Sequence, residues 1–435
     1  MDISELQTFL QSVYDDVRLC NDGDVADYIP QLKKVNPDLF GICACTVGGD
    51  IVKIGDAEMD FCLQSCSKPL TYCIVREMLG RKKVHSHVGY EPSGRGFNAH
   101  VLNRDGLPHN PLINAGAIMI ASLLASEEEP SHRFELIKQH YQEMCGHIGK
   151  IGFDNSVFLS EKQHADRNMS LAYYMRENGA FDGVISPNKI QEHLDLYFQC
   201  CSITVQAKMG AVFCSMLANG GVCPFTGKRL FSKETIKDCL TLMFGCGMYD
   251  YSGQFAFEIG LPAKSGVSGC IFLVVPNVMG VCIWSPRLDC VGNSVKGIEV
   301  CRRIVNQYNF HIFDQMVSNT FINNNNNNKS QDDSVVLQKI ITAASNNDVD
   351  VIKQLSGLID LNTGDYDGRT ALHLACSDGC VDVVRYLVVE KGCCTDVKDR
   401  WGNTPLTEIK DKGGDEYDTI RGLLHGVQDD DHIGV

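Results

Sequence analysis

A serine and a lysine stand three positions apart in the segment Ser65-Cys-Ser-Lys68. This spacing places both side chains on one face if the segment enters a helix. A lysine that burial keeps neutral can take the proton of a serine hydroxyl and so activate it as a nucleophile. The helix N-terminus adds N–H groups that can face an oxyanion. The segment indicates a serine hydrolase; the simpler alternative is a helix cap beside a solvated lysine.

A second motif, Lys264-Ser-Gly266, precedes the apolar run Ile271–Val275. A K-[ST]-G beside a strand, combined with an earlier S-x-x-K, resembles serine β-lactamases and penicillin-binding proteins. Gly266 and Val267 would bring backbone N–H groups close to the nucleophile. The glycine that precedes the lysine in a phosphate-binding loop is missing here, so a nucleotide site is not expected.

The elements that must position these motifs can be predicted from the pattern of apolar residues. Leu39–Thr46 and Ile51–Gly55 read as strands around the turn at residues 48–50. Apolar residues recur at helical spacing from residue 70 to 79, and Gly80 is a stop signal. Because this helix is strongly apolar, Lys68 should point into the fold. Ile271–Val275 and Val278–Trp284 read as core strands. We therefore expect an α+β domain whose sheet joins strands distant in sequence.

The chain divides at a run of six asparagines, Asn323–Asn328, which cannot build a core and reads as a linker. Beyond it, Asp367–Ala375 is echoed 34 residues later around Gly402-Asn-Thr-Pro-Leu406, a period typical of ankyrin repeats. Thr370 can cap a helix that Gly379 ends. We predict an N-terminal helical segment at 1–25, a catalytic domain at 26–318, a linker at 319–334, ankyrin repeats at 335–425 and an acidic tail at 426–435.

Charge and cysteine content exclude several classes of protein. The 435 residues carry a net charge of −15, so the basic face that nucleic-acid binding requires is not expected. The apolar runs are too short and broken for a membrane span. No secretory signal opens the chain, so its 21 cysteines should be reduced thiols. Their spacing matches no structural zinc site, and we expect no metal.

Longer motifs make a family resemblance specific. From about Ala26 to Phe313 the chain resembles the glutaminases of the phosphate-activated animal type, which also carry ankyrin repeats after the catalytic domain. The segments that carry the resemblance are Ala26–Leu32, Phe61–Pro69, Glu91–Gly94, Pro108–Ala117, Asp166–Asn168, Leu196–Gln199, Cys246–Asp250 and Pro262–Val267. The resemblance implies a serine β-lactamase-like α+β domain followed by a helical ankyrin domain.

The resemblance also implies the site residues. Ser65 matches the nucleophile, Lys68 its partner, and Tyr249 and Tyr197 the tyrosines of the catalytic group. Four further residues, together with Ser65, Tyr197, Tyr249 and Val267, match the family's substrate-binding positions: Tyr28, Asn114, Glu161 and Asn168. A carboxylate such as Glu161 suits the α-ammonium group of glutamine, and neutral donors suit its α-carboxylate. Ser65 and Val267 would supply the N–H groups of an oxyanion hole.

The expected reaction is hydrolysis of L-glutamine to L-glutamate and ammonia through a serine-bound γ-glutamyl ester, without a cofactor. Phosphate is a candidate activator, although the gating loop of the family, here Arg95–Leu102, differs from kidney-type enzymes at Ala99 and Val101. We also expect a homo-oligomer, a dimer or tetramer, and a protein partner for the repeats. The acidic start predicts a cytoplasmic protein, or a mitochondrial one if a leader precedes this chain.

Two rival functions stay open at this stage. One is a different hydrolase on the same scaffold, acting on a β-lactam or a D-Ala peptide. The other is a scaffold protein in which the repeats carry the function and the hydrolase domain is inactive. The intact set of Ser65, Lys68 and Tyr249 speaks against the second.

Overall fold

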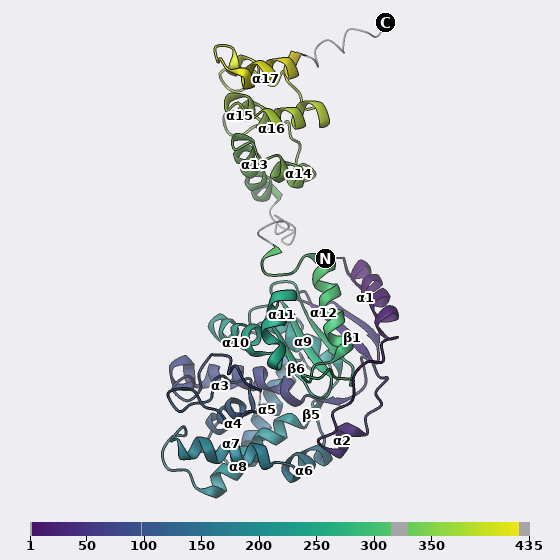
Figure 1. The fold of residues 1–435 in the computed structure, drawn as a ribbon, viewed down its shortest axis with the longest axis vertical. Helices are drawn as coiled ribbons and strands as arrows, with labels where there is room; N and C mark the ends of the chain where they lie inside the picture. Colours follow the sequence, from purple (N-terminus) through teal and green to yellow (C-terminus); the bar gives the residue numbers. More distant parts are fainter. Residues whose placement is uncertain (1, 97, 315–328, 426–435) are drawn as a thin grey trace. The chain divides into compact units, whose positions relative to one another are not determined.

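The computed structural model describes residues 2–96, 98–314 and 329–425, without the side chains of 329–335. Two compact units make up the chain, Met1–Phe313 and Asp314–Val435. Figure 1 shows the helices and strands of each unit.

The centre of the first unit is a five-stranded antiparallel sheet with the order β2-β1-β8-β7-β6. Its strands are β1 (Gly41–Thr46), β2 (Ile51–Gly55), β6 (Ala263–Gly266), β7 (Cys270–Val275) and β8 (Met279–Trp284). The hairpin of β1 and β2 and the core strands β7 and β8 confirm the predicted strands. Pairing of β1 with β8 joins segments more than 230 residues apart, as expected.

The two faces of this sheet bury different side chains, because successive residues of a strand point to opposite faces. Helices α1 (Ile3–Val17) and α12 (Val295–Tyr308) cover one face, where Ile42 and Ile283 are buried. Helix α9 (Ala207–Ala218) covers the other face, where Phe272 and Cys282 are buried. Gly280 allows the closest approach, since a Cβ there would lie 2.1 Å from the Ser215 nitrogen. The central strands β7 and β8 are therefore buried on both faces, which explains their continuous apolar sequences.

A group of helices continues the core beyond α9 and forms the lower part of the unit in Figure 1. It consists of α3 (Ser67–Val84), α4 (Asn114–Leu123), α5 (Pro130–Met144), α6 (Asn155–Gln163), α7 (Asp166–Glu177) and α8 (Pro187–Cys201). Helix α3 is interrupted at Gly80, whose φ of 78° and ψ of 155° are not helical. The predicted stop signal is therefore confirmed as a break rather than as the last turn.

Smaller elements link this helical group to the sheet. A three-stranded sheet with the order β3-β5-β4 is made by β3 (Phe61–Cys62), β4 (Gly152–Phe153) and β5 (Ile203–Val205). The remaining elements are α2 (Pro30–Lys33), the 3-10 turns η1 (Gln64–Cys66) and η2 (Tyr249–Tyr251), α10 (Lys233–Cys246) and α11 (Ser252–Glu258). Both 3-10 turns carry residues predicted for the site.

The second unit consists of paired helices. Its elements are α13 (Lys329–Ser345), α14 (Val349–Leu355), α15 (Ala371–Ser377), α16 (Val381–Arg385), the π-helical turn η5 (Tyr386–Glu390), η6 (Thr407–Ile409) and α17 (Asp415–His425). Thr370 and His373 form a capping box at the start of α15, and Gly379 has a φ of 75° just after its end. The predicted helix signals of the repeat are thus confirmed.

The predicted domain boundaries stay predictions, because several fall outside the described residues. Residues 319–328 of the linker and the tail 426–435 are not described, whereas 329–334 belong to α13, so that end of the predicted linker is helical. All 21 cysteines are free thiols, and only Cys20, Cys290 and Cys394 are not buried. In the described part of the chain, no helix is both long and apolar enough to cross a bilayer.

Candidate active site

Ser65 lies on a tight turn between β3 and α3. The turn starts at Gln64, a non-glycine residue with a φ of 49°, in a region that costs such residues about 1 kcal/mol or more. Two bonds hold it: Leu63 N donates to Ile203 O at 2.8 Å, and Ser67 Oγ donates to Gln64 O at 2.7 Å. The chain therefore presents the buried Ser65 at the N-terminal end of α3, where the helix dipole favours developing negative charge.

Lys68 points into the fold, as predicted, and is 3% exposed. Its Nζ donates to Asn114 Oδ1 at 2.7 Å. Burial and, after it, the positive charge of Lys264 lower the pKa of Lys68 to about 7. The thiols of Cys201 and Cys66 and the carboxylate of Glu161 oppose this lowering. A substantial fraction of Lys68 is therefore a neutral amine near pH 7, the form that can accept a proton.

Asn114 connects three of the predicted residues. It is the first residue of α4, and its Oδ1 accepts from Lys68 and, at 3.2 Å, from the Tyr197 hydroxyl. Its Nδ2 donates to Asn168 Oδ1 at 3.1 Å. The Tyr197 ring also lies 5.9 Å from Lys68 Nζ. This network fixes the direction of the lysine amine.

Tyr249 also lies beside Ser65, although the two residues are far apart in the sequence. It opens η2 with a φ of 54°, which a non-glycine residue rarely adopts. Ser252 holds the turn, since its Oγ donates to Tyr249 O at 2.7 Å and accepts from Met248 N at 2.9 Å. Burial raises the pKa of Tyr249 well above its usual range, and a hydrogen bond with Ser65 opposes that rise. Serine and tyrosine side chains thus lie together, with the tyrosine protonated.

Tyr28, Glu161 and Gln64 form a second cluster beside the serine turn. The Tyr28 hydroxyl donates to Glu161 Oε1 at 2.6 Å, and Gln64 Nε2 donates to the same oxygen at 3.0 Å. Tyr28 is 46% exposed as a residue, but its hydroxyl end is enclosed by these partners. Burial of the hydroxyl, and to a lesser extent the negative charge of Glu161, raises the pKa of Tyr28. Burial also raises the pKa of Glu161, which the two hydrogen bonds oppose. Gln64 was not among the predicted site residues, although it lies in the Phe61–Pro69 segment.

Strand β6 closes the site on the sheet side. A Cβ at Gly266 would lie 2.9 Å from Leu63 O, so only glycine lets the strand come this close to the serine turn. Val267 follows at the end of the strand and packs against a small apolar cluster with Ile29 and Val157. The structure therefore places Val267 next to the segment that carries Ser65.

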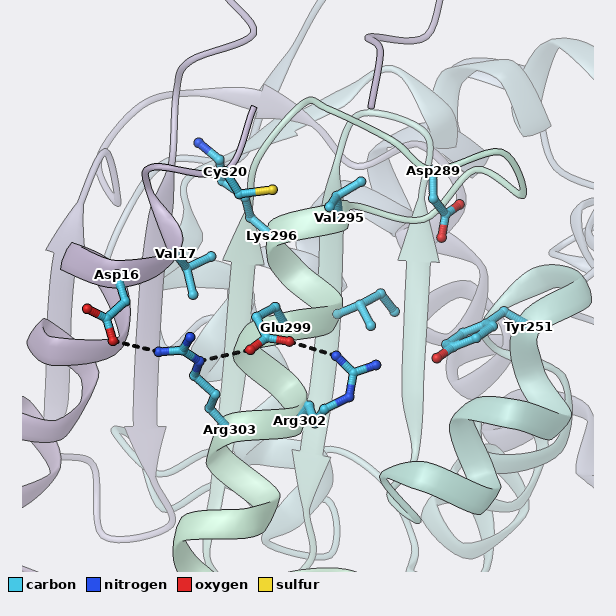
Figure 2. A pocket seen from close by; sticks show the side chains of 11 residues that line it. Asp16, Val17, Cys20, Tyr251, Asp289, Val295, Lys296, Glu299, Arg302 and Arg303 are labelled. Atoms are coloured by element: carbon cyan, nitrogen blue, oxygen red, sulfur yellow. Dashed lines mark hydrogen bonds and ion pairs between the residues drawn. The ribbon is translucent and has the colours of Figure 1, made fainter. Parts of the chain in front are cut away.

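A cavity of about 460 Å³ opens onto Tyr249. Its other walls include Pro92–Arg95, whose last residue begins the predicted gating loop, then Asn110, Leu112 and Ile113, and the end of α10. A cavity of similar volume, about 440 Å³, lies between α1 and α12 (Figure 2). Four of its charged side chains are paired in a row, with Arg303 bonded to Asp16 and Glu299, and Glu299 bonded to Arg302. We assign the site to the first of these two cavities, because Tyr249 lines it and none of the predicted residues lines the second. A much smaller cavity is lined by Lys68 and Tyr197.

All nine predicted site residues fall in this region. Eight of them lie in or beside the hydrogen-bonded groups around the Ser65 turn, and Val267 directly follows strand β6. The sequence did not indicate the contact that Gln64 makes with Glu161. It showed Lys264 as part of a motif but did not indicate that its side chain is buried. Among the described residues, no group of three or more histidine, cysteine or acidic side chains could hold a metal ion. The arrangement can activate a serine, donate a proton and present a carboxylate to a cation.

Comparisons with known proteins agree with this arrangement. The family model described as glutaminase matches residues 23–313, and that for ankyrin repeats matches residues 304–431. The chain is 43% identical to the mitochondrial liver isoform of glutaminase from Rattus norvegicus, over 94% of this chain and 67% of that protein. It is 45% identical to putative glutaminase 3 from Caenorhabditis elegans, over 92% and 68%. The chain thus spans about two thirds of the length of these animal relatives.

Solved structures give the same picture for the first unit. A probable glutaminase, ybaS, superimposes with a TM-score of 0.68 and 32% identity, over 72% of this chain and 99% of that one. The protein called Mglu, in its glutamate form, superimposes with a TM-score of 0.65 and 33% identity, over 71% and 69%.

Proposed function

Because this chain belongs to the glutaminase family, we propose that it hydrolyses L-glutamine to L-glutamate and ammonia, with Ser65 as the nucleophile. The observation that carries the proposal is Lys68, a buried amine with a pKa of about 7, one helical turn from Ser65. A serine hydroxyl needs such a neighbour to become a nucleophile at neutral pH.

The cluster around Glu161 suits the α-ammonium group of glutamine. Two donors, Tyr28 and Gln64, hold one carboxylate oxygen, so the group is oriented before substrate arrives. An ammonium ion in contact with Glu161 would also restore the charged state that burial disfavours. The amide groups of Asn114 and Asn168 would face the α-carboxylate.

In the acylation step, Ser65 Oγ bonds to the side-chain carbonyl carbon while Lys68 takes the hydroxyl proton. Backbone N–H groups of Ser65 and Val267 stabilise the oxyanion. The carbon–nitrogen bond breaks as the Tyr249 hydroxyl gives its proton to the nitrogen, which leaves as ammonia. Lys68 then returns its proton to Tyr249, and Tyr197 with Asn114 keeps the amine in place throughout.

In the second step, water attacks the γ-glutamyl ester. The neutral amine of Lys68 takes a proton from the water and passes it to Ser65 Oγ as the bond between that oxygen and the carbonyl carbon breaks. Glutamate leaves, and the enzyme returns to its first state. All groups in both steps belong to this chain or to its substrate, so no cofactor takes part.

A substrate panel tests the proposal against the rival hydrolases. Purified protein is given glutamine, asparagine and a chromogenic β-lactam, with Ser65→Ala as the control. We expect ammonia from glutamine alone and none from the variant. Turnover of the β-lactam without turnover of glutamine would reject the proposal.

Regulation and assembly follow from the family as further proposals. We expect phosphate to stimulate this chain less than kidney-type enzymes, because Ala99 and Val101 change the gating loop; a phosphate titration of both enzymes tests this. A dimer or tetramer is expected in light scattering, and a protein is the expected partner of the ankyrin repeats. Cell fractionation would decide between a cytoplasmic and a mitochondrial location.

A further inference from the structure

Lys264 is a buried cation at the site that has no role in the mechanism above. It lies in β6, opposite Phe272 of β7, and is 0% exposed. A buried ammonium group needs hydrogen-bond acceptors. Lys264 Nζ donates to two main-chain carbonyl oxygens, Ser265 O at 2.6 Å and Gly247 O at 3.1 Å.

These two carbonyls belong to the two segments that hold the proposed chemistry. Gly247 leads into the η2 turn that begins with Tyr249, and Ser265 leads through Gly266 to Val267. The Ser265 N–H also donates to Gly247 O at 3.0 Å, so this oxygen accepts from two groups of β6. A Cβ at position 247 would lie 1.8 Å from Ala263 O, which means that the two segments are in direct contact.

The ammonium group also lies against the tyrosine ring. Lys264 Nζ is 4.5 Å from the centroid of the Tyr249 ring, within the range of a cation–π interaction. When Tyr249 gives up its proton, negative charge develops on its oxygen and spreads into the ring. A positive charge beside the ring favours that state, and the low-dielectric surroundings strengthen the effect.

We propose that Lys264 is a positioning residue for glutamine hydrolysis, whose ammonium group locks the Tyr249 turn to strand β6 and favours proton release from the tyrosine. The inference rests on the proposed glutaminase function. It adds a role for the first residue of the Lys264-Ser-Gly266 motif, whose side chain bonds to main-chain carbonyls and touches the ring of a proposed catalytic residue.

A consequence for pH dependence follows from the neighbouring charges. The titratable groups that face Lys68 are Lys264 from β6, Cys66 from η1, Tyr197 and Cys201 from α8, and Glu161 from α6. Those that face Lys264 are Tyr249 and the thiols of Cys66, Cys246 and Cys270. Burial lowers the pKa of Lys264 to about 8, so it is mostly charged below that pH. Removing its charge would let Lys68 bind a proton more readily, and the acid limb of kcat would move to higher pH.

The test compares Lys264→Met with Lys264→Arg, which keeps the charge. For Lys264→Met we expect kcat to fall by about 10²-fold, KM to change less than about threefold, and the acid limb to move upward. Lys264→Arg should have a higher kcat than Lys264→Met, and its acid limb should lie at the pH found for the wild type. The matched control is Lys296→Met, which removes another buried lysine, 2% exposed, on the far face of the sheet. Lys296 also donates to a main-chain carbonyl, Arg18 O, and lies 5.3 Å from the centroid of an aromatic ring, that of Phe40. The kcat and pH profile of this variant should be those of the wild type.

The possible results separate clearly. Near-normal kcat and pH profile in a folded Lys264→Met protein would overturn the inference. Equal losses of kcat in Lys264→Met and Lys264→Arg, with the acid limb unmoved, would also overturn the inference. So would failure of both variants to fold, because either result would mean that Lys264 serves packing alone. A wild-type protein that releases no ammonia from glutamine would instead refute the proposed function itself.

Discussion

Asn114→Asp offers a sharp test of Lys68 as the base, because it changes one amide to a carboxylate of the same shape. The oxygen that accepts from Lys68 Nζ lies 2.7 Å away. Two unit charges about that far apart attract by roughly 6 kcal/mol at an effective dielectric constant of about 20. That energy corresponds to roughly four pKa units, and burial of the new carboxylate cancels part of it.

We therefore expect the pKa of Lys68 to rise from about 7 by at least about two units in this variant. The sign follows from the charge: a carboxylate stabilises the ammonium form, which cannot accept the serine proton. At pH 7.5 the neutral fraction would fall by roughly 25-fold for a two-unit rise. The assay is kcat for ammonia release from pH 6 to 10, in which the acid limb should move upward.

A graded control comes from Asn168→Asp, which puts the charge one hydrogen bond further from Lys68. Its acid limb should move less than that of Asn114→Asp. If the limb of Asn114→Asp coincides with that of the wild type while circular dichroism reports an intact fold, Lys68 is not the base and the mechanism is wrong.

Four further predictions concern the same site. Ser65→Ala and Lys68→Ala should each nearly abolish turnover, and the double variant should be no worse than either, because residues that act as one unit fail together; additive losses would contradict this. Tyr249→Phe should lower kcat by roughly 10²–10⁴ with a much smaller change in KM, and a dominant KM effect in steady-state kinetics would point to binding instead. Glu161→Ala should do the reverse, raising KM for glutamine more than it lowers kcat, which a substrate titration measures. A chain that ends near residue 322 should keep glutaminase activity, since the site residues lie between Tyr28 and Val267; a folded but inactive truncation would refute this.

Local signals predicted much of the fold. The alternation in Ile51–Gly55, the continuous apolar runs of β7 and β8 and the threonine cap of α15 are short-range patterns, and each formed the expected element. Gly80 broke its helix because the residue takes a positive φ there. These outcomes depend on neighbours within a few residues, which is why the sequence sufficed.

The contacts that build the site could not be predicted in this way. Tyr28 meets Glu161 across 133 residues, and Lys68 meets Asn114 across 46. No local pattern indicates that Gln64 takes a left-handed φ or that the Lys264 ammonium reaches Gly247 O. The family resemblance supplied Tyr28, Glu161, Lys68 and Asn114 as candidate residues, but only the tertiary fold supplies their partners and burial.

Release of ammonia and glutamate from L-glutamine, measured together on the purified chain and on Ser65→Ala, tests the central claim most directly. We predict equal amounts of the two products from the wild type and none from the variant above the rate without enzyme. Equal product release by a folded Ser65→Ala protein, or none by the wild type, would contradict the claim that Ser65 carries out glutamine hydrolysis in this chain.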